Sequence, residues 1–176
     1  AVSAFVRLVI ICATLMLTFF DAHTTRKLTP FIALAAACLP SALLEFGLCF
    51  PERLPTLQAR PQLLMFLRLI DVALLVVIIG GLYSGHNFRL VSDLSSAAAM
   101  VALTVILSLR CATAHGRRRL QLLIALLIIM PIYIGLGVLL FFGHERAAPY
   151  IYVVVIPMTV FGALAIAFAL LRYDLW

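Results

Sequence analysis

The chain has 176 residues, of which 65% are hydrophobic and 11% are charged, and its formal net charge is +6. A soluble domain carries about 25% charged residues, so this composition excludes a water-soluble globule. The length suits one helical bundle, with no room for a catalytic domain beside it, and we expect the chain not to be an enzyme.

Six apolar stretches approach the length needed to cross a bilayer, which is about 20 residues in a helix. In chain order they cover residues 4–20, 30–50, 63–83, 94–109, 120–142 and 150–171. We expect helices, because lipid offers no partner to unpaired backbone groups, and the apolar runs do not alternate as the strands of a transmembrane barrel do. The sequence therefore predicts an all-α, polytopic transmembrane bundle of about six helices, forming a single domain over residues 1–176.

Basic residues are distributed unevenly between the two ends of these stretches. One set of ends holds eight of them, namely Arg7, Arg53, Arg60, Arg110, Arg117, Arg118, Arg119 and Arg172. The other set holds four, namely Arg26, Lys27, Arg89 and Arg146. Cytoplasmic ends carry an excess of Lys and Arg, so we expect both termini to be cytoplasmic. Arg117, Arg118 and Arg119 are the strongest topology anchor.

The positive charge also bears on the partners of the chain. Anionic lipid on the cytoplasmic leaflet attracts basic residues beside membrane helices. The longest basic run has three residues and directly precedes a predicted span, which is typical of an anchor. We therefore expect membrane lipid as a partner and no nucleic acid.

Apart from Arg7, which is counted with the helix ends, three charged residues lie inside predicted spans, where charge is costly and marks functional candidates. Glu45 lies six residues before Pro51 and Arg68 six residues after Gln62, which places both at similar depths, about 9 Å along their helices. Asp71 is three residues from Arg68 and shares its helix face. The pattern predicts an intramembrane ionic network of Glu45, Arg68 and Asp71. Three interpretations remain open: a network that only sets helix register, a sensing or proton-linked group, or an Arg68 that snorkels to the interface.

No pattern in the chain indicates catalysis, a cofactor or a metal. The histidines avoid the middle of the predicted spans and lack HxxxH or HxH spacing; they are His23, His86, His115 and His144. The four cysteines form no CxxC pair, and buried cysteine behaves as a small hydrophobic residue. Nucleotide-binding and hydrolase motifs are also missing from the sequence. The sequence therefore predicts no catalytic, cofactor-binding or metal-binding residue.

The last two apolar stretches each contain a proline. Pro131 and Pro157 remove a backbone donor and can kink a helix, so both are candidate hinges. The simpler interpretation is a packing adjustment, which membrane helices tolerate. The final stretch ends at Arg172 and Tyr173, where a movement of that helix would reach the cytoplasm.

The C-terminal third resembles a known type of module. The run that starts Arg117-Arg118-Arg119, the two prolines of the last helices and the ending Arg172-Tyr173-Asp174-Leu175 resemble the last two helices of the seven-helix N-terminal sensor regions of bacterial histidine kinases. The loop element Phe50-Pro51-Glu52 is also similar to one found there. The resemblance implies that the basic run opens the penultimate helix and that the final helix leads into an output domain. Two departures are the count of six helices and the end of the chain where an output domain would begin.

These observations favour one function and leave two alternatives. The favoured one is a non-catalytic sensory module in the bacterial inner membrane, which relays a stimulus through the last helix. The first alternative is an accessory subunit of a larger membrane complex, with other subunits or a second copy as partners. The second is a small transporter or channel that uses the Glu45–Arg68–Asp71 group.

Overall fold

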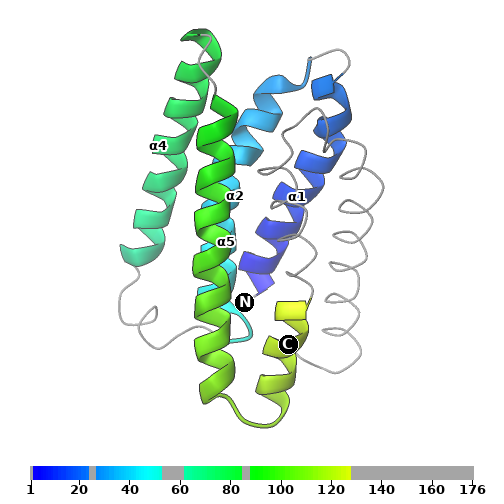
Figure 1. Ribbon diagram of the computed structural model, residues 1–176, viewed down its shortest axis with the longest axis vertical. Helices are drawn as coiled ribbons and strands as arrows, with labels where there is room; N and C mark the ends of the chain where they lie inside the picture. Colours follow the sequence, from blue (N-terminus) through cyan, green and yellow to red (C-terminus); the bar gives the residue numbers. More distant parts are fainter. Residues whose placement is uncertain (1, 24–26, 53–61, 85–87, 128–176) are drawn as a thin grey trace. The chain divides into compact units, whose positions relative to one another are not determined.

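A computed structural model describes residues 2–23, 27–52, 62–84 and 88–127 of the chain. Within these residues the structure is helical, with short connections and no strand. The long helices are α1 (Val2–His23), α2 (Thr29–Cys49), α4 (Gln62–Ser84) and α5 (Phe88–Thr113), shown in Figure 1. A further helical segment covers residues 117–127. The all-α prediction is therefore confirmed for the described part of the chain.

Three of these helices are long and apolar enough to cross a membrane. Their apolar segments are Thr29–Cys49, Gln62–Gly81 and Leu94–Thr113, with mean hydropathies of 1.9, 2.6 and 1.8. The described part of α1 adds a shorter apolar segment, Ser3–Leu15. The chain is thus a helical membrane protein. The count of six helices and the cytoplasmic position of both termini stay predictions, and most of the spans expected at 120–142 and 150–171 lies outside the described residues.

The chain divides into two compact units, Ala1–Ile106 and Leu107–Trp176. The single transmembrane domain expected over residues 1–176 stays a prediction. Within the first unit α2 is the most buried helix. Of its most apolar stretch 56% is buried, against 17% for that of α4. It packs against α1 on one side and against α4 on the other (Figure 1).

Small residues let α2 approach both neighbours closely. Ala35 and Ala42 face α1, where they form a buried cluster with Ile11. Ala33 and Ala37 lie on another face of α2 and pack against Ile78 of α4. Alanine removes side-chain bulk between helices, and van der Waals packing is the main attraction between helices in lipid. The alanine-rich sequence of α2 thus explains why it occupies the central position.

The helix that contains the fourth predicted span extends beyond that span at both ends. The hydropathy pattern places the span at residues 94–109, whereas α5 runs from Phe88 to Thr113. The helix continues past Arg110 because its backbone hydrogen bonds do not depend on side-chain polarity: the amide of Ala114 still donates to the carbonyl of Arg110 at 2.9 Å. Gly116 then takes φ +58°, a left-handed value that favours glycine and separates α5 from the next helix.

The basic triplet follows that glycine directly. Arg117, Arg118 and Arg119 are exposed and form the first turn of the helical segment 117–127. The triplet therefore belongs to the start of a helix and not to the connection that precedes it. The backbone amide of Leu120 donates to the carbonyl of Gly116, so the helix begins as soon as the left-handed turn is complete.

The orientation predicted from the basic residues can be measured by cysteine labelling. In a variant with the four native cysteines replaced by alanine, Lys27→Cys should react with an impermeant thiol reagent only from outside the cell, because it lies on the predicted outer side. His115→Cys should react only from the cytoplasmic side. Both positions are exposed, and Val76→Cys on the apolar face of α4 serves as an unreactive membrane control. Labelling of Lys27→Cys from the cytoplasm would contradict the orientation.

Candidate functional site

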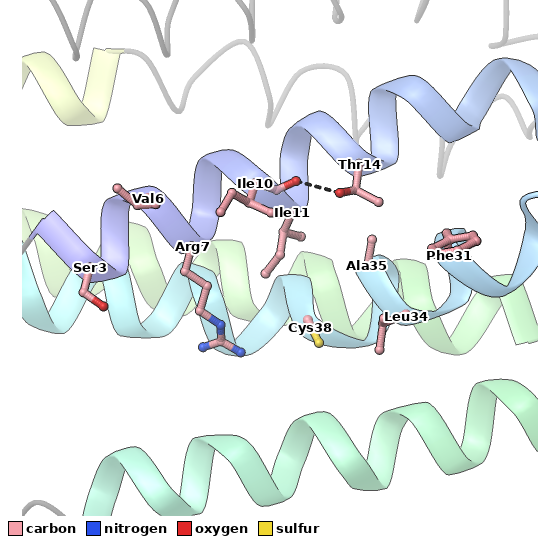
Figure 2. Close-up of a pocket in the computed structure, with 10 residues that line it drawn as sticks. All are labelled: Ser3, Val6, Arg7, Ile10, Ile11, Thr14, Phe31, Leu34, Ala35 and Cys38. Atoms are coloured by element: carbon pink, nitrogen blue, oxygen red, sulfur yellow. Dashed lines mark hydrogen bonds between the residues drawn. The ribbon is translucent and has the colours of Figure 1, made fainter.

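Four charged side chains from three helices meet inside the first compact unit. Arg7 of α1 contacts Glu45 of α2 at 2.5 Å and Asp71 of α4 at 2.5 Å. Its guanidinium also donates to the hydroxyl oxygen of Ser41 on α2 at 2.9 Å. Figure 2 shows the Arg7 side chain extending away from α1 across α2 in the direction of α4. Arg7 therefore links all three helices through one guanidinium.

Arg68 is the second cation of this group. Its guanidinium lies 2.9 Å from the same Glu45 oxygen that Arg7 contacts, and 3.8 Å from the Asp71 oxygen that Arg7 also contacts. The side chain of Arg68 is 47% exposed, whereas that of Arg7 is 19% exposed. Arg7 is thus the inner cation and Arg68 the outer one. We call Arg7, Glu45, Arg68 and Asp71 the ionic cluster.

Helical spacing explains why these groups converge. Ser41 and Glu45 are four residues apart and lie on one face of α2. Arg68 and Asp71 are three apart on α4 and likewise share a face. The Ser41 hydroxyl donates to the backbone carbonyl of Cys38 at 3.2 Å, which leaves its oxygen to accept from Arg7. Each helix therefore presents its polar atoms toward the same point.

The charges of the cluster balance one another, and both carboxylates are buried. Two arginines face two carboxylates, so the group is neutral when all four are ionised. Glu45 and Asp71 are both buried. Taking charges out of water costs several kcal/mol per ion, and attraction offsets this only while every charge keeps a partner. One oxygen of Asp71, Oδ1, is buried without a hydrogen-bond partner among the described residues.

Aromatic side chains neighbouring the cluster residues in sequence pack against one another. Phe46, next to Glu45, is 1% exposed and stacks on Phe50 with ring centroids 4.9 Å apart. Phe5, two residues before Arg7, packs against Phe46 at a centroid distance of 6.3 Å. This packing adds apolar contacts between α1 and α2 close in sequence to the ion pairs, and a low dielectric strengthens each pair and raises the penalty for losing one.

The structure brings together the three residues that sequence spacing connects, and it adds a fourth. Glu45, Arg68 and Asp71 lie in contact, while their functional role stays a prediction. Arg7 was counted only as a basic residue at a helix end. The depth argument applied to Glu45 would have found it, since Arg7 is five residues from the start of α1 and Glu45 is four from the end of α2.

The remaining predicted residues belong to the part of the chain outside the first compact unit. Arg117, Arg118 and Arg119 lie in the second compact unit, and their role as topology anchor stays a prediction. The hinge candidates Pro131 and Pro157 and the exit residues Arg172 and Tyr173 lie outside the described residues. Over the described ranges, no group of three or more His, Cys, Asp or Glu side chains is placed to hold a metal ion.

Comparison of the chain with known proteins gave no match to a family model, to a curated protein or to a solved structure.

Proposed function

We propose that this chain is a signal-transducing module of a bacterial inner membrane, non-catalytic itself, which passes a stimulus through its last helix to a cytoplasmic output domain. One observation carries the proposal: each carboxylate of the ionic cluster is approached by two arginines at a single oxygen. Glu45 Oε2 lies within 2.9 Å of both Arg7 and Arg68, and Asp71 Oδ2 is approached by the same pair. Because both arginines reach the same oxygens, each carboxylate can exchange one arginine partner for the other.

A signal requires two helix arrangements that differ by only a few kcal/mol, so that a stimulus can shift their populations. If α1 moves away with Arg7, Arg68 remains beside Glu45 and Asp71 on the other two helices. The carboxylates then keep one cation instead of none. The second arrangement leaves one uncompensated negative charge instead of two, so its cost stays within the few kcal/mol that a stimulus can supply.

A purely structural bundle has less need for such a group. Apolar side chains of similar volume often stabilise a buried position as well as an ion pair does, or better. The cluster therefore favours a switching role over that of a passive accessory subunit. The route to an output is supported by the resemblance of the basic run at Arg117 and the ending at Arg172-Tyr173 to sensor kinases.

A fusion protein tests this proposal. The full chain is joined after Trp176 to the catalytic region of a histidine kinase, and autophosphorylation is measured in proteoliposomes. Arg7→Leu and Arg68→Leu each favour a different pairing of the carboxylates, so we expect them to change kinase output in opposite directions, each by about tenfold, the effect of 1.4 kcal/mol on a two-state equilibrium.

The control for the fusion is Val76→Ala, an exposed apolar position of α4, which should leave output unchanged. Folding of each variant is followed by the fraction that stays monodisperse in detergent. If well-folded Arg7→Leu and Arg68→Leu fusions have the same output as the parent, the cluster does not control signalling and the proposal fails.

A further inference from the structure

The interface between α1 and α2 is open along one side. There the two helices leave a groove of about 790 Å³. Its walls are apolar and face outward: Val6 and Ile10 come from α1, and Phe31 and Leu34 from α2 (Figure 2). Arg7 also lines the groove and is its charged group. The groove therefore joins a lipid-like surface to the inner cation of the ionic cluster.

The length of the groove matches a chain from one leaflet. Figure 2 shows Ser3 toward one end of it and Thr14 and Phe31 toward the other. Eleven residues separate Ser3 and Thr14, which corresponds to about 16 Å along a helix. This is about half of the 30 Å hydrocarbon core. The hydroxyl of Thr14 donates to the backbone of Ile10, so this end offers an apolar wall.

Arg7, one helical turn from Ser3 along the groove, selects the head of the ligand, and about 10 Å of helix separates it from Thr14. Glu45 and Asp71 already balance the two arginines, so an anionic head would add an uncompensated negative charge in a medium of low dielectric constant. A cationic head would be repelled by Arg7. An arginine has five N–H donors. The three hydrogen bonds of Arg7 to the described residues use only some of them. A neutral acceptor oxygen can therefore still bind Arg7.

We propose that this groove binds a neutral single-chain lipid with one acceptor oxygen near its end, such as a long-chain alcohol, ester or ketone. Its oxygen accepts a hydrogen bond from Arg7 and its chain lies along Val6, Ile10, Phe31 and Leu34. A ligand held between α1 and α2 at Arg7 changes how strongly α1 holds the carboxylates. Its role as the stimulus rests on the proposed signalling function, whereas its binding does not.

Photolabelling tests the binding site. The full chain in phosphatidylcholine nanodiscs is irradiated with a long-chain alcohol that carries a diazirine at its far end, and labelled peptides are mapped by mass spectrometry. We expect label in the segments 3–14 and 31–38, removable by excess unreactive alcohol. Ile10→Trp and, independently, Leu34→Trp fill the groove from its two walls and should lower this label by about tenfold. Both positions are exposed and tolerate a larger side chain.

The control is Val76→Trp, an exposed apolar α4 position that does not line the groove, which should leave the label unchanged. Label that persists in both groove variants, or that excess alcohol does not remove, reflects bulk lipid and overturns the proposal. If a diazirine fatty acid of equal chain length labels the groove more strongly than the alcohol, the proposal that the ligand has a neutral head is wrong. If the alcohol labels the groove but does not change the output of the kinase fusion, the signalling role is contradicted while the binding site is still supported.

Discussion

Replacing Arg7 by leucine will lower the free energy of unfolding by about 3 kcal/mol. The change leaves Glu45 and Asp71 with Arg68 as their cation, and the described residues bring no other positive charge to them. Removing one partner of a buried pair costs about 3–5 kcal/mol, and we expect the lower end because the Arg7 side chain keeps 19% exposure. The measurement is reversible unfolding in mixed micelles, with the detergent melting temperature as a second readout.

The matched control for this substitution is Arg119→Leu. Arg119 is exposed in the helical segment 117–127, and surface substitutions usually change stability by about 0.5 kcal/mol or less. A loss for Arg7→Leu no larger than that for Arg119→Leu would mean that the guanidinium of Arg7 makes no net contribution to holding the three helices together.

Replacing Gly47 by leucine will cost about 2 kcal/mol, because the site is already filled. Gly47 lies on α2 where α5 approaches. A Cβ at this position would stand 2.6 Å from Cδ1 of Leu103 and 3.6 Å from Cγ2 of Ile106. Leu103 is fully buried, so its side chain cannot swing out to the surface to make room. We expect a lower unfolding free energy in mixed micelles and a lower melting temperature in detergent.

Gly80→Leu is the control for overpacking. Apart from the adjoining turns of α4 itself, no atom of the described residues lies within 4 Å of where a Cβ of residue 80 would stand. Replacing a helical glycine there should be neutral or stabilising by up to about 1 kcal/mol, because glycine is a poor helix former. Truncating the neighbour in Gly47→Leu/Leu103→Ala should recover part of the loss. Equal effects of the two glycine substitutions would show that α2 and α5 do not approach closely at Gly47.

The helices bounded by strong signals could be predicted from the sequence almost to the residue. The second apolar stretch was expected at 30–50 and α2 covers Thr29–Cys49; the third was expected at 63–83 and α4 covers Gln62–Ser84. Prolines lie near both ends of α2, at Pro30 and Pro51, and punctuate the apolar run. At α5 the helix is longer than the apolar stretch, because hydropathy measures side-chain transfer to lipid whereas helical hydrogen bonds continue through Arg110.

The site was predictable in part for a similar reason. Equal depth along two neighbouring helices brought Glu45 and Arg68 together, and this requires only the rise per residue of a helix. Arg7 was missed because the topology rule assigns a basic residue near a helix end to the membrane surface. That rule does not consider that a long side chain can turn inward when two carboxylates on neighbouring helices lie within its reach. The groove beside it depends on how α1 and α2 pack, which no pattern within either helix contains.

The interaction between Arg7 and Asp71, across α2, is the central claim of this account. A double-mutant cycle with Arg7→Leu, Asp71→Leu and the double variant, unfolded in the same mixed micelles, measures it directly. We expect the double variant to lose less unfolding free energy than the sum of the two single losses, by about 1 kcal/mol or more. The reason is that removing both charges leaves the Glu45–Arg68 pair balanced. Losses that add to within about 0.5 kcal/mol would contradict a direct link between the first helix and α4.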